Sequence, residues 1–106
     1  MDVVAALADP TRRRILELLV AGDVPAGELA EQFPVSRPAV SRHLRVLREA
    51  GLVEVRVDGQ RRVYSLDPRP LAELDAWLAP YRQFWSQRLD ALDTEIRRGR
   101  RDRRPT

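Results

Sequence analysis

Residues 36–51 restrict the fold of this chain more than any other stretch, because they combine a helix start, a helical period and a helix stop. Ser36 is of a residue type that caps helix N-termini, and Gly51 is of the type that most often follows a helix C-terminus. Apolar residues recur between them at steps of four and three: Val40, Leu44 and Leu47. This spacing predicts an amphipathic helix that is buried along one side.

The opposite face of this predicted helix is polar and rich in arginine. Its candidate contact residues are Ser36, Arg37, Pro38, Ser41, Arg42, His43 and Arg45. A face of this kind is solvated by water or bound by an anionic partner.

The distribution of charge favours the anionic partner. Residues 36–62 carry seven arginines against three acidic residues, and residues 97–106 carry six arginines against one. Residues 1–35 and 63–96 each carry three arginines against six acidic residues. A basic segment between two acidic ones is the pattern expected of a nucleic-acid-binding protein.

The segments around the basic helix predict a winged helix-turn-helix, a mainly α fold with a two-stranded β-hairpin. Residues 2–8, 10–21 and 26–33 are predicted to be helical, and the last of these joins the basic helix through a short turn. Beyond Gly51 the period changes to two, with alternating valines up to Asp58-Gly59, a dipeptide typical of hairpin turns. The loop holds either two or four residues. The wing, residues 57–62, would present Gln60, Arg61 and Arg62.

The last segment is predicted to be a long dimerisation helix. Apolar residues recur through it at steps of three and four, with two further aromatic residues beside them: Leu71, Leu74, Trp77, Leu78, Tyr81, Phe84, Trp85, Leu89 and Leu92. A second copy of the chain is the simplest cover for so wide a stripe. Pro80 is expected to kink this helix or divide it in two. The domain is expected to span residues 1–96, with residues 97–106 a disordered basic tail.

Composition narrows the function classes further. The chain has 106 residues and no cysteine, which removes disulfides and thiolate metal ligands and fits a cytoplasmic protein. It has no apolar run long enough to span a membrane. No nucleophile–base pair, glycine-rich phosphate loop or metal-ligand cluster is visible, so neither an enzyme nor a cofactor is expected.

Several motifs, taken together and in this order, resemble the arsenical-repressor (ArsR/SmtB) family over residues 2–96. They are Ala8-Asp9-Pro10-Thr11-Arg12-Arg13-Arg14-Ile15-Leu16, Glu28-Leu29-Ala30, the segment Ser36 to Leu44, Leu47-Arg48-Glu49-Ala50-Gly51-Leu52-Val53, and Gly59-Gln60-Arg61-Arg62-Val63-Tyr64. The resemblance implies a homodimeric winged-helix repressor that binds a pseudo-palindromic DNA operator. Metal-sensing members use cysteines, or Asp and His ligands on the last helix. Those ligand sets are missing here, so the chain resembles the non-metal branch, with an unknown effector.

The expected mechanism is insertion of helix 36–50 into the major groove, with the wing on the adjacent backbone or minor groove. Arg37 and Arg42 are the best candidates for base contacts, because guanidinium pairs bidentately with guanine O6 and N7. His43 has two possible roles: a partly buried structural residue or a contact to a DNA phosphate. Two alternatives remain: a winged-helix module that binds another protein, and a repressor gated by an apolar ligand at the aromatic terminal helix.

Overall fold

The structure is a computed structural model that describes residues 2–102, with side chains up to residue 99. The chain divides into two compact units, residues 1–72 and residues 73–106. No helix within the described residues is both long and apolar enough to cross a membrane.

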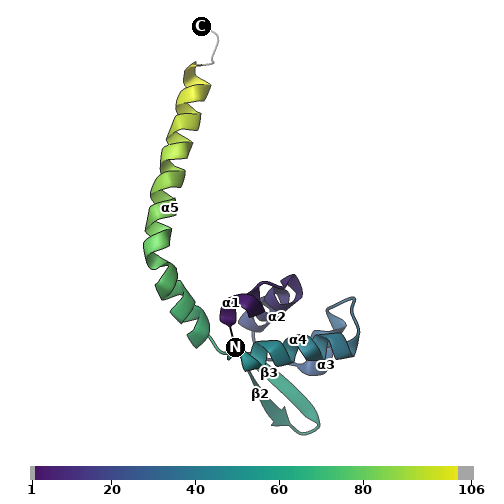
Figure 1. The fold of residues 1–106 in the computed structure, drawn as a ribbon. Helices are drawn as coiled ribbons and strands as arrows, with labels where there is room; N and C mark the ends of the chain where they lie inside the picture. Colours follow the sequence, from purple (N-terminus) through teal and green to yellow (C-terminus); the bar gives the residue numbers. More distant parts are fainter. Residues whose placement is uncertain (1, 103–106) are drawn as a thin grey trace. The chain divides into compact units, whose positions relative to one another are not determined.

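The first unit carries four short helices and a small sheet (Figure 1). In chain order the elements are α1 (Val3–Leu7), α2 (Pro10–Val20), β1 (Val24–Pro25), α3 (Ala26–Glu31), α4 (Arg37–Glu49), β2 (Val53–Asp58) and β3 (Arg61–Leu66). α5 (Arg69–Asp102) begins in this unit and continues through the second. The mainly helical fold with a β-hairpin, predicted from the sequence, is confirmed.

Local capping explains where the first helices begin. The Asp9 carboxylate accepts hydrogen bonds from the backbone N–H groups of Thr11 at 2.8 Å and Arg12 at 3.2 Å, and Pro10 occupies the first helical position of α2. Burial raises the pKa of Asp9, but the two backbone hydrogen bonds and the nearby positive charge together outweigh it, so the pKa lies below its ordinary value. α3 begins at Ala26, and Pro25 at its N-cap position supplies no side-chain cap.

The core of the first unit lies between the helices and one face of the sheet. Its fully buried side chains are Ile15, Leu29, Val40, Leu44, Leu47 and Leu52. Three of these belong to α4, so the predicted buried side of that helix is confirmed. In α2, Ile15, Leu16 and Leu19 are buried and Leu18 is half-buried.

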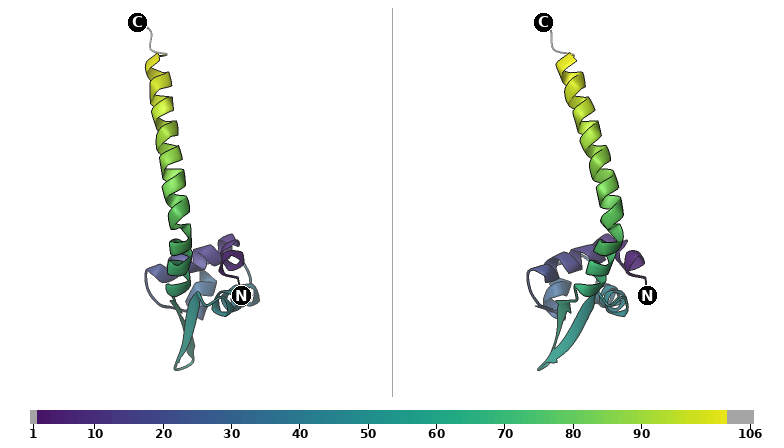
Figure 2. Two further views of the ribbon diagram at one scale, coloured as in Figure 1. Left: turned by 60° about the vertical axis from the view of Figure 1, so that its left-hand side comes forward. Right: turned by 90° about the vertical axis from the view of Figure 1, so that its left-hand side faces the viewer.

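The sheet is antiparallel with the strand order β1-β3-β2. Asp58 pairs with Arg61, so the hairpin loop is the shorter of the two predicted, with Gly59 and Gln60 alone outside the ladder. Gly59 has φ +63°, the left-handed conformation that such a tight turn requires. Figure 2 shows β2 and β3 extending together from the helices to this tip. β1 adds a third strand of two residues that the sequence did not predict.

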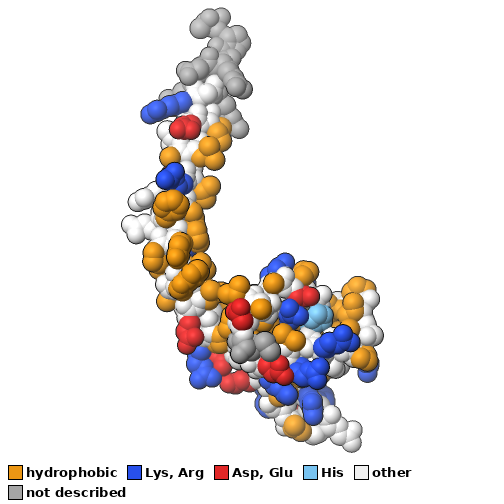
Figure 3. Space-filling view, in the orientation of Figure 1, with side chains coloured by type: hydrophobic (Ala, Val, Ile, Leu, Met, Phe, Trp, Pro, Cys, Tyr) orange, Lys and Arg blue, Asp and Glu red, His pale blue; other side chains and the backbone are white. Residues whose placement is uncertain are grey.

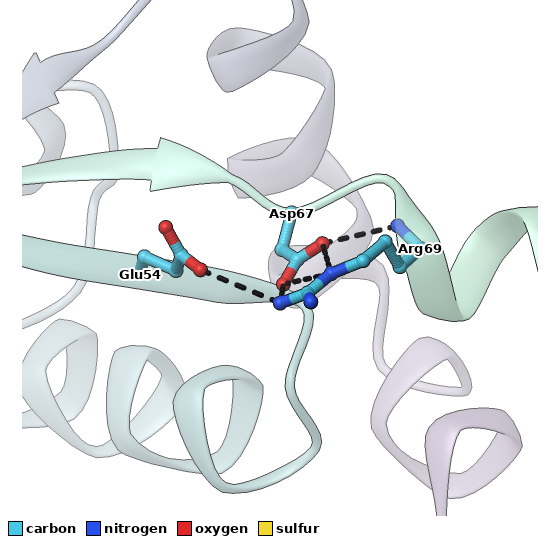
Figure 4. Close-up of polar contacts among 3 residues, drawn as sticks. All are labelled: Glu54, Asp67 and Arg69. Atoms are coloured by element: carbon cyan, nitrogen blue, oxygen red, sulfur yellow. Dashed lines mark hydrogen bonds and ion pairs between the residues drawn. The ribbon is translucent and has the colours of Figure 1, made fainter.

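The β3–α5 junction is held by ion pairs around a buried carboxylate (Figure 4). Asp67 is 8% exposed and accepts hydrogen bonds from the guanidinium of Arg69 at 2.6 and 3.0 Å and from its backbone N–H at 3.1 Å. The same guanidinium lies 3.6 Å from the Glu54 carboxylate. Hydrogen bonding from the Arg69 side chain lowers the pKa of Asp67 to about 2.

α5 differs from the prediction in two respects. One helix runs through Pro80, so the division into two helices is not observed. Residues 97–102, assigned above to a disordered tail, continue the helix, and Arg97 pairs with Asp93 at 3.0 Å one turn earlier. Residues 103–106 lie outside the described residues.

Candidate nucleic-acid interface

α4 is a capped helix that fixes one basic face outward. The Ser36 hydroxyl accepts a hydrogen bond from the Ala39 N–H at 3.2 Å at its start. Gly51 follows its end with φ +77°, the left-handed conformation that ends many helices. Because Val40, Leu44 and Leu47 are in the core, the helix cannot rotate without exposing them. The opposite face is therefore held toward solvent.

The predicted contact residues of α4 all lie on this exposed face, except one. Those exposed to solvent are Ser36, Arg37, Pro38, Ser41, Arg42 and Arg45. Arg37, Arg42 and Arg45 have no hydrogen bond or ion pair within the described part of the chain. Figure 3 shows basic side chains gathered over α4 and the hairpin.

His43 is the exception. It is half-buried, and its Nδ1 lies 3.3 Å from a guanidinium nitrogen of Arg12. A guanidinium can only donate, so Nδ1 is the acceptor in this contact. This contact fits the structural interpretation of His43.

The three arginines at the start of α2 have intramolecular partners, which the sequence did not reveal. Arg12 donates to the carbonyl oxygens of Ala6 at 2.7 Å and Ala5 at 3.2 Å. Arg13 donates to two further carbonyls at that end of α1, and Arg14 pairs with Glu17 at 3.1 Å. Carbonyls at a helix C-terminus have no partner in their own helix. Arg12 and Arg13 therefore cap α1.

The wing residues predicted to contact DNA are all exposed near the hairpin tip: Gln60, Arg61 and Arg62. Arg61 pairs with Asp58 across the tip at 3.3 Å, with both side chains largely exposed. Arg62 has no such partner among the described residues.

An open groove of about 500 Å³, here called the α4–wing groove, separates α4 from the hairpin. Its lining residues are Ala26, Pro38, Ser41, Arg42, Leu44, Arg45, Arg48, Arg62 and Tyr64. Tyr64 is buried and belongs to the core of the first unit. Arg48 is an exposed groove residue that the predicted contact set did not include.

The apolar stripe of α5 is largely uncovered. The exposed fractions of its large side chains are 63% for Trp77, 50% for Tyr81, 59% for Phe84, 43% for Trp85, 60% for Leu89 and 52% for Leu92. Figure 3 shows hydrophobic side chains along this helix. Leu74 and Leu78 are half-buried. Leu71 packs against the core of the first unit, so part of the Leu71 side chain is already covered by an intramolecular contact.

Metal ligands do not gather in the described residues: no three His, Cys, Asp or Glu side chains there lie close enough to hold an ion.

Comparison with known proteins identifies the family. The helix-turn-helix domain family matches residues 7–56. The HTH-type transcriptional regulator Rv2034 of Mycobacterium tuberculosis is 55% identical over 84 residues, which cover 79% of this chain and 76% of that protein. The transcriptional repressor SdpR of Bacillus subtilis is 42% identical over 77 residues, covering 73% and 86%.

A solved structure supports the same assignment. The crystal structure of a possible transcriptional regulator for arsenical resistance superposes with a TM-score of 0.72 at 47% identity, covering 90% of this chain and 96% of that one. The chain therefore belongs to the ArsR family of winged helix-turn-helix proteins, which are DNA-binding transcriptional regulators and not enzymes.

Proposed function

We propose that this regulator is a homodimer that binds a pseudo-palindromic operator in double-stranded DNA and represses transcription. The observation that carries the proposal is the exposed face of α4, where Arg37, Arg42 and Arg45 have no partner among the described residues. The other face of α4 is locked in the core, so these arginines are presented to whatever approaches the first unit. A row of unpaired guanidinium groups on an exposed helix face suits the phosphates and base edges of a DNA major groove.

The proposed contacts divide along α4. Arg37 and Arg42 read guanine through O6 and N7, and Ser41 donates to a base edge or phosphate. The Ser36 hydroxyl accepts from the Ala39 N–H and keeps its own proton to donate to DNA. Further contacts are a thymine methyl for Pro38, the backbone for Arg45, and the backbone or minor groove for Gln60, Arg61 and Arg62. His43 stays behind this face and supports it through Arg12.

Dimerisation through α5 is supported by its exposed apolar stripe. Six large apolar side chains between Trp77 and Leu92 are each at least 43% exposed, and Ile96 extends the row. Contiguous exposed apolar surface of this kind marks an interaction site. A second copy of α5 offers a self-complementary cover, since a two-fold interface places the same patch on both subunits. Two copies of α4 then meet half-sites about one DNA turn apart, roughly 34 Å.

Repression is the regulatory sense that the relatives support, because one of them is named a transcriptional repressor. In this mechanism the dimer occupies its operator and blocks transcription.

Selection of bound duplexes from a random-sequence pool tests the proposal. We expect an enriched pair of inverted half-sites and an affinity that falls steeply with salt, because phosphate contacts release counterions. Absence of any enriched sequence, or retention of duplex that does not depend on salt, would contradict it and favour a protein-binding module. Light scattering of the same preparation should give the mass of a dimer.

A further inference from the structure

The α4–wing groove is a strongly basic concave surface. Four arginines line it, Arg42, Arg45 and Arg48 from α4 and Arg62 from β3. None of them has a hydrogen bond or ion pair within the described residues. No acidic side chain lines the groove, so nothing in it neutralises these charges.

The geometry of duplex DNA specifies what this groove holds when α4 and the wing are both engaged. Neighbouring major and minor grooves are separated by one sugar–phosphate strand. A protein that places α4 in the major groove and the wing in the next minor groove must straddle that strand. We propose that a single DNA backbone strand runs through the α4–wing groove, and that Arg48 and Arg62 clamp its phosphates from opposite walls. This inference rests on the proposed function and assigns Arg48 to the DNA interface.

The position of Arg48 on α4 supports its role as a backbone contact. Arg42, Arg45 and Arg48 follow one another at three-residue steps, so they span about 9 Å along the helix axis. The N-terminal end of the helix, with Arg37 and Ser41, leads into the major groove. Arg48 lies in the last turn, behind the base-reading positions and beside the groove that the strand occupies. It is therefore a positioning residue with no part in reading sequence.

The salt dependence of DNA binding measures the proposed phosphate contacts of Arg48 and Arg62. The logarithm of the binding constant falls by about 0.9 per phosphate contact for each tenfold rise in salt. Arg48→Ala and Arg62→Ala each remove one contact per subunit, so each should reduce the slope by about 1.8 in a dimer. Both should weaken selected and random duplexes by the same factor, leaving their ratio unchanged. Arg14→Ala is the matched control, because Arg14 is paired with Glu17 and lines neither α4 nor the wing.

Neutral phosphate analogues locate the strand. A selected duplex carrying one methylphosphonate at a time is titrated with the wild type, Arg48→Ala and Arg62→Ala. At a clamped phosphate, the methylphosphonate should lower the affinity of the wild type for the duplex. It should not lower further the affinity of the variant that lacks the arginine contacting that phosphate. The phosphates that couple to Arg48 and to Arg62 should lie on the same strand. Thermal unfolding by circular dichroism checks that both variants are folded, and Arg48→Gln replaces Arg48→Ala if needed.

The outcomes separate this inference from the proposed function. If a duplex is selected and Arg48→Ala and Arg62→Ala keep the wild-type salt slope, the strand does not pass through the groove although the protein binds DNA. Coupled phosphates on opposite strands overturn the clamp as well. If no duplex is selected at all, the proposed function fails and this inference fails with it.

Discussion

Truncation of Leu89 in α5 should lower the dissociation free energy of the proposed dimer, and the exposed fraction of Leu89 determines by how much. Leu89→Ala removes three carbon atoms, each CH₂ group contributing about 0.8 kcal/mol when it is fully buried. Since 60% of the side chain is exposed in the single chain, contact with a partner helix can add about 1.4 kcal/mol per copy. A symmetric dimer contains two copies, so the dissociation free energy should fall by about 3 kcal/mol, roughly a 100-fold rise in the dimer Kd.

Sedimentation equilibrium over a range of concentrations measures that Kd. Gln87→Ala is the matched control, because residue 87 is exposed and lies about half a turn of helix away from Leu89. The control should leave the Kd unchanged. A Leu89→Ala variant that dimerises as tightly as the wild type would refute the assignment of this stripe, as would a wild type that stays monomeric at micromolar concentrations.

Two further predictions concern the first unit. Arg12→Ala should lower the free energy of unfolding by about 2–3 kcal/mol in urea titrations, because it strips hydrogen bonds from two α1 carbonyls and from His43. Arg14→Ala, which removes only an exposed ion pair, should cost less than about 0.5 kcal/mol, and equal losses in the two variants would disprove the capping role. The pKa of Asp67 is about 2 when folded, against about 3.9 for an ordinary Asp, so the native state favours its ionised form. The ionised carboxylate therefore stabilises the fold fully above about pH 4, and this stabilisation is lost as the pH falls through 2. In Asp67→Asn the free energy of unfolding should depend less on pH in that window. An unchanged pH dependence would argue against the role of Asp67.

The helix-turn-helix and the hairpin could be predicted because their signals are local. α4 has a cap, a period and a stop within 16 residues, and each agrees with the others. The hairpin was predicted from the alternating valines and Asp58-Gly59. Its loop length stayed open because both loops place the same side chains on the core face, and only the pairing of Asp58 with Arg61 decided it.

What the sequence missed depends on contacts between distant segments. β1 has two residues, one of them proline, so it carries no periodic signal and exists only as a pairing of Val24 with Tyr64. The partners of Arg12 at the end of α1 cannot be inferred from residue spacing either. Arg48 follows the spacing of the basic face of α4, but it joins the candidate site only when the fold brings it beside Arg62 across the α4–wing groove.

If the exposed face of α4 reads base pairs, then the Arg42→Ala variant must change the sequence preference of the protein. The variant and the wild type are each titrated against the selected duplex and against duplexes with every single base-pair change in one half-site. We expect Arg42→Ala to lose about 1–3 kcal/mol per half-site and to tolerate substitution at one base pair that the wild type requires. Arg14→Ala should keep the wild-type preference throughout. An Arg42→Ala variant with unchanged affinity and an unchanged preference at every position would contradict the claim that this face reads DNA.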